Sequence, residues 1–415
     1  MTRATPARRD EPAGSRQAAS GGPGGCAAER RGLLKDWVGR RAEPLGTNGG
    51  LGARGAVLAG LAAVAAAAFA AGCVTEAGPS LTVVSWGGSY ARACVLGYHE
   101  RFTAETGIEI RLESYNGGLA QVRAQVETGN VHWDVVDVEI ADAVSGCDEG
   151  ILEPIDPAML PAGPDGTPAV DDFFPAALTE CGVGTSFFST VYAYHPARFP
   201  NGPPATIDDF FDLERFPGRR GMRRVPHVNL EFALIADGVP VDEVYATLDT
   251  PEGVARAFRK LDTIKDQVVW WEAGAQPPQM LADGEVVMST AYNGRIFNAQ
   301  VAEDQPFVIV WDGQVYDVGP LAIVAGTPNL DAARRFLAFA STAESMAGVG
   351  RYISYSPARR SGVPLITTHA EAGIDMNPHM PLTADHLTRA LANDWEWWSD
   401  HADEMNERFA AWLAQ

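Results

Sequence analysis

From residue 81 onward, short runs of β-branched and aromatic residues alternate with stretches in which apolar residues recur every three or four positions. The first pattern is typical of buried strands, and the second of helices that cover a sheet. Three strand–helix units follow one another at the start of this region, which predicts a parallel, doubly wound α/β sheet. The predicted strands are residues 81–85, 108–115 and 133–140, and the predicted helices are 90–105, 119–127 and 141–147.

A second α/β series begins after a strongly β-prone run at residues 186–194. The run ends at His195-Pro196, and we expect residues near 190–195 to cross between two lobes. At 415 residues the chain is longer than one average domain, which agrees with two lobes. A long helix is predicted over residues 385–413. The main strands predicted in this series are 286–292, 307–311 and 316–324, the last interrupted by Gly319-Pro320.

The N-terminal part of the chain differs in composition. Residues 1–54 hold few large apolar side chains, so they cannot bury enough surface to form a core. Residues 55–75 carry no charge and are mostly Ala, as in a signal peptide, although a membrane anchor or a buried helix would also fit. We predict a leader and linker over residues 1–80. Cleavage would fall either after Ala70 or directly before Cys73, which would then be lipidated.

Charge is distributed unevenly along the chain. Residues 1–54 have a net charge of +5, and the rest of the chain has a net charge of −26. An acidic body argues against nucleic acid as a partner, because phosphates need a basic face. It is compatible with a cationic ligand, although an acidic surface also serves solubility.

Signatures of catalysis and of metal binding are missing. No nucleophile elbow, P-loop or zinc-peptidase motif occurs, so neither catalytic residues nor an enzyme activity is predicted. No Cys-x-x-Cys motif or Cys/His cluster has zinc spacing, so no metal and no cofactor is predicted. In an exported protein, Cys147 and Cys181 would form either a disulfide or two separate buried thiols. Cys94 receives no role.

Aromatic and acidic residues recur where predicted strands end. Because strand ends of one sheet converge in space, these side chains could line one cleft. Aromatic faces hold ammonium groups by cation–π contact, and carboxylates hold them by charge-assisted hydrogen bonds. The pattern therefore predicts a cation-binding cleft. Its candidate residues are Trp86, Tyr90, Asp137, Glu139, Tyr292, Asp317 and Tyr355.

Several motifs, taken in order, resemble one family over nearly all of residues 81–415. The chain is similar to bacterial extracellular solute-binding proteins of the spermidine/putrescine type, the soluble receptors of ABC importers. The motifs are LTVVSWGGSY at 81–90, WDVVDVE at 133–139, ECGVGTSFFSTVYAYHP at 180–196, VVMSTAYNGRIF at 286–297, GPLAIVAGTPN at 319–329 and RYISYSPAR at 351–359.

The resemblance implies a two-lobed, periplasmic-binding-protein-like (type II) α/β fold with the ligand between the lobes. Lobe one would comprise residues 81–190 plus 318–362, and lobe two residues 195–316 plus 363–415. A glutamate that contacts the ligand amine in this family falls on Glu231. The remaining implied contacts fall on Trp86, Tyr90, Tyr292, Tyr355 and the region of Trp398.

Three positions depart from the polyamine-binding pattern. Val228 and Gly319 stand where the family has aspartates, and Glu139 stands where it has a serine. The nearby acids Asp317 and Glu139 would compensate, or the ligand is a different cationic or polar solute.

The expected protein is therefore a periplasmic receptor, monomeric, that closes on a polyamine-like solute by hinge motion and delivers it to an ABC permease and its ATPase. Its contact with the membrane would be limited to the leader or a lipid anchor. Alternative solutes are an amino-acid derivative, thiamine or iron. A secreted α/β hydrolase is the alternative from another class, and it would need a nucleophile beside a base.

Overall fold

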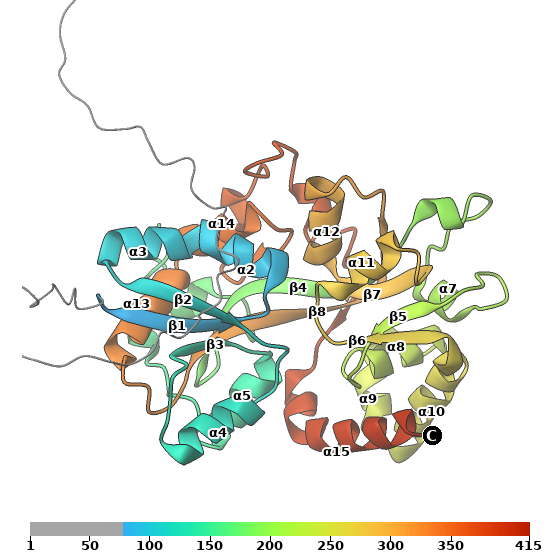
Figure 1. The fold of residues 1–415 in the computed structure, drawn as a ribbon, viewed down its shortest axis with the longest axis horizontal. Helices are drawn as coiled ribbons and strands as arrows, with labels where there is room; N and C mark the ends of the chain where they lie inside the picture. The colour runs from blue at the N-terminus through green and yellow to red at the C-terminus, as the bar shows by residue number, and fades with distance from the viewer. Residues whose placement is uncertain (1–77) are drawn as a thin grey trace, which may run out of the picture. The chain divides into compact units, whose positions relative to one another are not determined.

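The computed structural model describes residues 78–415 (Figure 1). The predicted leader, including Cys73 and both candidate cleavage positions, lies outside these residues. None of the helices in this part of the chain combines the length and the apolar character needed to cross a membrane.

One mixed sheet runs through the described region in the strand order β2-β1-β3-β8-β4-β7-β5-β6. Strands β1, β2 and β3 are parallel at one end, and β5, β6 and β7 are parallel at the other. In the middle, β4 and β8 are antiparallel to each other and to their outer neighbours. The strands are β1 (Ser80–Ser85), β2 (Glu109–Ser114), β3 (Val135–Asp137), β4 (Gly182–Tyr194), β5 (Arg220–Arg223), β6 (Val268–Trp271), β7 (Met288–Tyr292), β8 (Val308–Ile323), β9 (Ser356–Pro357) and β10 (Leu391–Ala392).

The two long strands β4 and β8 join the two ends of the sheet (Figure 1). Most of their side chains are buried, as expected for strands covered on both faces. The parallel sheet predicted for the three strand–helix units is confirmed for β1, β2 and β3, whereas the central strands β4 and β8 run antiparallel to each other and to their outer neighbours. The predicted break at Gly319-Pro320 is wrong. Pro320 lacks an N–H but still accepts a hydrogen bond from Val138 N (3.0 Å), so the strand continues through it.

The end of the sheet formed by β1, β2 and β3, with the helices that cover it, is called the first lobe below. Helices α2, α3, α13 and α14 lie on one face, and α4 and α5 on the other (Figure 1). Gly97 lets two of these helical segments approach closely, since a Cβ there would lie 2.6 Å from Val349 N. The helices are α2 (Gly88–Cys94), α3 (Glu100–Thr106), α4 (Ala120–Thr128), α5 (Ile140–Asp148), α13 (Leu330–Ala340) and α14 (Ala343–Gly350).

The opposite end, formed by β5, β6 and β7, is called the second lobe. Helices α8, α9, α10 and α15 cover one face, and α11 and α12 cover the other (Figure 1). Part of the segment expected in this lobe also contacts the first lobe, because Glu371 pairs with Arg92 of α2 (2.5 Å). The helices are α8 (Asn229–Ala236), α9 (Val244–Leu248), α10 (Pro251–Asp262), α11 (Gln276–Ala282), α12 (Asn293–Ala302) and α15 (Trp395–Leu413).

The terminal helix is shorter than predicted. It begins at Trp395 rather than near residue 385, because Asp394 caps it by accepting a hydrogen bond from Trp397 N (3.0 Å). The residues before it form turns and the short strand β10, which pairs with β8. The structure also places Cys147 and Cys181 in a disulfide, which joins the end of α5 to the start of β4. Cys94 is a buried free thiol.

Candidate functional site

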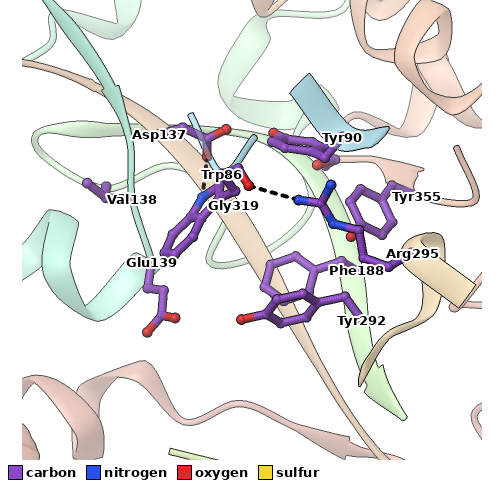
Figure 2. Close-up of a pocket in the computed structure, with 11 residues that line it drawn as sticks. Trp86, Tyr90, Asp137, Val138, Glu139, Phe188, Tyr292, Arg295, Gly319 and Tyr355 are labelled. Atoms are coloured by element: carbon purple, nitrogen blue, oxygen red, sulfur yellow. Dashed lines mark hydrogen bonds between the residues drawn. The ribbon is translucent and has the colours of Figure 1, made fainter. Parts of the chain in front are cut away.

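A cavity lies where β1 and β3 end, and five of its eleven lining residues are aromatic (Figure 2). We call it the aromatic pocket. Tyr355 lies with its ring centre 5.6 Å from that of Tyr90, and Phe188 lies 5.5 Å from Tyr292. The rings come from both lobes and from β4 between them. The other residues that line the aromatic pocket include Trp86, Asp137, Glu139, Arg295 and Gly319.

Trp86 is held in place by its neighbours. Its indole Nε1 donates a hydrogen bond to Asp137 Oδ1 (3.2 Å) from the end of β3. A Cβ at Gly117 would lie 2.7 Å from Trp86 Cη2, so glycine allows this turn to pack against the ring. Burial raises the pKa of Asp137 to about 7, although the hydrogen bonds from Trp86 and Ser85 work in the opposite direction.

Arg295 brings a positive charge to the aromatic pocket that was not predicted from the sequence. It lies in the first turn of α12 and reaches the loop after β1 (Figure 2). Its Nη1 donates to Gly87 O (2.7 Å), and its Nη2 donates to Trp86 O (3.1 Å). Its Nε is buried and has no hydrogen-bond partner among the described residues. The guanidinium therefore fixes the first loop and leaves one donor unused.

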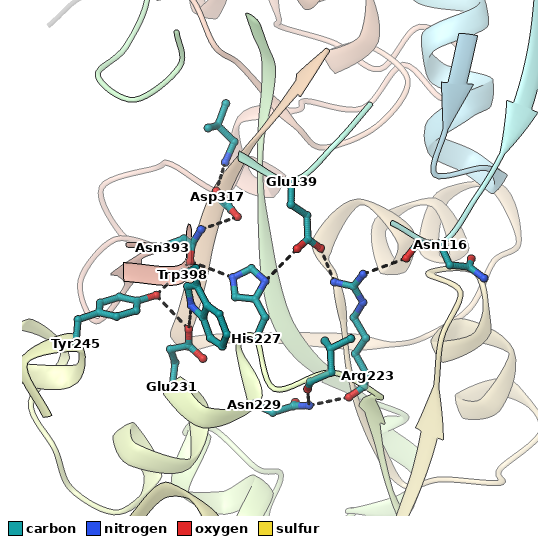
Figure 3. A network of polar contacts seen from close by, with 12 residues as sticks. Asn116, Glu139, Arg223, His227, Asn229, Glu231, Tyr245, Asp317, Asn393 and Trp398 are labelled. Carbon is teal, nitrogen blue, oxygen red and sulfur yellow. Dashed lines mark hydrogen bonds and ion pairs between the residues drawn. The ribbon is translucent and has the colours of Figure 1, made fainter. Parts of the chain in front are cut away.

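A cluster of charged side chains from both lobes lies next to the aromatic pocket, with which it shares Glu139 (Figure 3). We call Glu139, Arg223 and His227 the ionic cluster. Arg223 Nη1 donates to Glu139 Oε1 (2.6 Å), and His227 Nδ1 lies 3.4 Å from Glu139 Oε2. Burial would raise the pKa of Glu139, but the Arg223 charge and the His227 hydrogen bond hold it well below its usual range. Glu139 is therefore an ionised carboxylate already engaged by two cations.

Polar side chains continue from His227 into the second lobe (Figure 3). His227 Nε2 lies 3.0 Å from Asn393 Oδ1, and Asn393 Nδ2 donates to Asp317 Oδ2 (2.9 Å). Deeper in the lobe, Glu231 Oε1 accepts hydrogen bonds from Trp398 Nε1 (2.7 Å) and from Tyr245 OH (3.1 Å). Burial raises the pKa of Glu231, and it raises the pKa of Asp317 to about 7.

The structure brings most of the predicted site residues together. Six of the nine line the aromatic pocket, and they come from segments far apart in the sequence. They are Trp86, Tyr90, Asp137, Glu139, Tyr292 and Tyr355.

The other three predicted residues, Asp317, Trp398 and Glu231, lie outside that pocket. Asp317 lines an adjoining cavity together with Glu139 and Tyr292. Trp398 lines a separate cavity on the far side of the ionic cluster. Glu231 is fully buried, with its carboxylate beneath His227, and lines none of these three cavities. The position implied for a ligand-contacting glutamate is thus occupied by a residue of the lobe interior.

The adjoining cavity carries hydrogen-bond donors that lack partners. Trp271 and Thr290 line it, and their Nε1 and Oγ1 atoms are buried and find no partner within residues 78–415. Arg223 lines the same cavity, as does Val228, whose φ of 69° is a strained value for a β-branched residue. Backbone strain of this kind is often kept where it positions functional groups. Val228 stands directly before α8 and beside His227.

Arg223 and Arg295 of the cleft were not predicted, because the sequence around each gives only a weak indication of a binding site. Arg223 ends a four-residue strand, and Arg295 follows the strand end at Tyr292-Asn293-Gly294. Both arginines stand at or just after strand ends, as the predicted aromatic and acidic residues do. A prediction limited to partners of a cation leaves out these positive charges of the cleft.

Comparisons with known proteins agree with this architecture. Residues 97–381 match the family described as bacterial extracellular solute-binding protein. A relative from Pseudomonas aeruginosa, the gamma-aminobutyric acid-binding protein, is 42% identical over 348 residues, which cover 84% of this chain and 94% of the relative.

Two solved structures extend the comparison. The PBP MotA from A. tumefaciens B6 in complex with glucopine is 29% identical, with a TM-score of 0.73 over 80% of this chain and 99% of that chain. A GABA receptor is also 29% identical, with a TM-score of 0.68 over 81% of this chain and 98% of that chain. These similarities cover both ends of the sheet and the strands between them.

Proposed function

The chain belongs to the bacterial extracellular solute-binding proteins, and we propose that its solute is a small zwitterionic amino acid of the γ-aminobutyrate type. As a member of this family it is a periplasmic receptor that delivers a small solute to an ABC permease, and it is not an enzyme. The two-lobed fold suits capture by closure of the lobes around the solute.

The observation that carries the proposal is the presence of both signs of charge in one aromatic cleft. Arg295 lines the aromatic pocket with Asp137, and Arg223 lines the adjoining cavity with Asp317. A polyamine carries only positive charge, so both guanidinium groups would repel it. A zwitterion would find an opposite charge in the cleft both for its ammonium group and for its carboxylate. The similarity to a gamma-aminobutyric acid-binding protein supports the same solute class.

The arrangement of donors favours one orientation of the solute. The unpartnered donors Trp271 Nε1 and Thr290 Oγ1 belong to residues that line the same cavity as Arg223, where they suit a carboxylate. The aromatic faces around Asp137 suit an ammonium group. The two cavities share Glu139, Phe188 and Tyr292 in their linings, so a short flexible chain could pass from one to the other.

Isothermal titration calorimetry tests the solute class directly. The solutes compared are γ-aminobutyrate, putrescine, spermidine, and the truncated analogues butylamine and butyrate. We expect γ-aminobutyrate to bind, and each truncated analogue to bind at least about tenfold more weakly, since each loses one charge-assisted contact. Tighter binding of putrescine or spermidine than of γ-aminobutyrate would overturn the proposal in favour of a polyamine.

Two conservative variants test the orientation. Trp271→Phe removes the indole N–H and keeps an aromatic ring, and Asp137→Asn removes a charge at nearly constant volume. We expect Trp271→Phe to weaken binding of butyrate and γ-aminobutyrate, but not of butylamine. Asp137→Asn should weaken butylamine and γ-aminobutyrate, but not butyrate. The reverse pattern would place the carboxylate in the aromatic pocket, beside Arg295.

The same proposal includes features that lie outside the described residues or need measurement in solution. These are export by the leader, with lipidation of Cys73 as one route, a monomeric state, and motion of residues 81–190 with 318–362 against 195–316 with 363–415. Intact-mass measurement of the protein from its native host distinguishes cleavage after Ala70 from a lipidated Cys73.

A further inference from the structure

The His227 side chain lies between two hydrogen-bond acceptors. Its Nδ1 faces Glu139 Oε2 at 3.4 Å, and its Nε2 faces Asn393 Oδ1 at 3.0 Å. Asn393 presents its oxygen to the imidazole because its Nδ2 donates to Asp317 Oδ2 (2.9 Å). An imidazole with an acceptor at each nitrogen needs a proton on both. The geometry therefore favours a doubly protonated, positively charged His227.

The carboxylate bound by His227 belongs to the other lobe. Glu139 lies between β3 and α5 of the first lobe, whereas Arg223 and His227 follow from β5 of the second. Both carboxylate oxygens are engaged, Oε1 by Arg223 at 2.6 Å and Oε2 by His227. The three side chains are only 14–22% exposed, so water and salt screen their attraction less than that of surface pairs.

The polar groups beneath His227 hold its ring in place. Trp398 packs against the imidazole edge to face, with ring centres 4.9 Å apart. The indole Nε1 of Trp398 is in turn bound by Glu231 Oε1 at 2.7 Å, and Tyr245 OH lies between Glu231 and Asn393. Glu231 has no contact with the cleft, so its influence on the cleft passes through these neighbours.

We propose that the ionic cluster is a charge latch that fastens the first lobe to the second, with Glu231 as a positioning residue for His227. The latch rests on the proposed receptor function, because it acts on lobe closure, but it is independent of which solute binds. It favours the closed arrangement by contacts that exist only when the lobes meet. A solute that binds the closed form gains affinity from it.

The latch also makes closure dependent on pH. Burial lowers the pKa of His227, but the hydrogen bond and the charge of Glu139 outweigh burial and raise it to about 9. The latch is therefore intact near neutral pH and is lost as the pH rises through about 9. The charged or titratable groups that act on the imidazole or on its partner carboxylate come from both lobes and from β8. They are Glu139, Asp142, Arg223, Glu231 and Asp317.

Small-angle X-ray scattering of the purified protein, without added solute, tests the latch. At pH 7 we expect Glu139→Gln to raise the ratio of open to closed form about tenfold, since it weakens two charge-assisted contacts. Glu149→Gln is the matched control, because Glu149 pairs with Arg123 within the first lobe at 2.7 Å. The control should scatter like the wild type. Circular dichroism confirms that each variant is folded.

Two further measurements keep the test independent of that one variant. Wild-type protein should open between about pH 8 and pH 10, and His227→Gln should abolish this response, as expected for a titrating imidazole. Glu231→Gln keeps the side-chain volume and an acceptor oxygen, but removes a nearby negative charge. It should shift the opening midpoint to lower pH by about one unit, which a purely structural role would not do.

The outcomes separate this inference from the proposed solute. Equal open fractions for wild type, Glu139→Gln and Glu149→Gln at every pH would overturn the latch. So would a wild type that is fully open at pH 7. Either result leaves the calorimetric test of γ-aminobutyrate unaffected. Conversely, failure to bind γ-aminobutyrate while the scattering responds as expected would overturn the solute class and retain the latch.

Discussion

The aromatic pocket and the ionic cluster form two walls of one cleft, yet they are built in different ways. The aromatic pocket consists of side chains at strand ends, each beside a turn that marks it in the sequence. The ionic cluster joins Glu139 of the first lobe to Arg223 and His227 of the second, and its partners Asn393 and Glu231 come from still other segments. The difference suggests that the aromatic pocket mainly contacts the solute, whereas the ionic cluster governs closure and also presents Arg223 to the solute carboxylate.

Loss of Glu231 should have the largest effect, and it should act on stability rather than on solute contact. Glu231→Ala leaves the buried Trp398 Nε1 without its acceptor and removes one of the two acceptors of Tyr245 OH, which keeps only Asn393 Oδ1. We expect the free energy of unfolding to fall by about 3 kcal/mol, measured by urea denaturation.

Glu231→Gln is the matched control for this loss, because it retains an acceptor oxygen and the volume. A glutamine variant that stays as stable as wild type but loses solute binding would instead make Glu231 a ligand contact, as the family resemblance implies.

Truncation of Trp86 should act mainly on binding. Trp86→Ala removes a ring of the aromatic pocket, and we expect the solute dissociation constant to rise about tenfold to fiftyfold. Trp311→Ala is a control of the same type, since Trp311 stacks on His386 at 3.8 Å and lines none of the cavities of the cleft. Calorimetry on both variants measures the difference, and equal losses would mean that Trp86 has no specific role.

The two walls should also differ in their dependence on pH. Burial raises the pKa of Asp137 and of Asp317 to about 7, well above the unfolded value of about 3.9. The folded state then binds more protons than the unfolded state, so stability should fall as the pH rises from about 4 to 7. Deprotonation of His227 should lower the stability further between about pH 6.5 and 9, because its folded pKa is raised to about 9.

Thermal unfolding between pH 5 and pH 9 measures these two losses. Asp137→Asn should flatten the dependence below pH 7 without changing it above pH 8, and His227→Gln should do the reverse. A stability that increases steadily from pH 5 to pH 9 would contradict both assignments.

The smallest effect is expected from the hydroxyl of Tyr292. The ring of Tyr292 packs against Phe188 and Trp271, so Tyr292→Phe keeps the aromatic wall. We expect solute affinity to change by less than about threefold in calorimetry. A loss comparable to that of Trp86→Ala would show that the hydroxyl, rather than the ring, contacts the solute.

The sequence was informative where function depends on local pattern. Trp86, Tyr90, Tyr292 and Tyr355 were found because each stands at a strand end, and the sheet brings strand ends together. Arg223 and Arg295 are absent from the prediction because guanidinium groups are not partners of a cation. The burial of Glu231 could not be predicted from its own segment, since its partners Tyr245 and Trp398 lie 14 and 167 residues further along.

The two-lobed α/β fold predicted from the sequence is confirmed, but the direction of the central strands and the start of the last helix are not, for a similar reason. The strands were recognised from their β-branched runs, but the antiparallel direction of β4 and β8 depends on which strands pair, and pairing is not encoded in local pattern. The terminal helix was predicted ten residues too early, at 385 instead of Trp395. Its true start follows from a single capping residue, Asp394, whose role was not considered.

The position of β8 has a consequence for how the protein is made. In the first lobe, β8 lies between β3 and β4, although β3 ends at Asp137 and β8 ends only at Ile323. The early strands therefore lack a central neighbour until much of the chain has been synthesised. Such a delay in long-range pairing slows folding. A polypeptide that must pass through a membrane before it folds gains time from this order of strands.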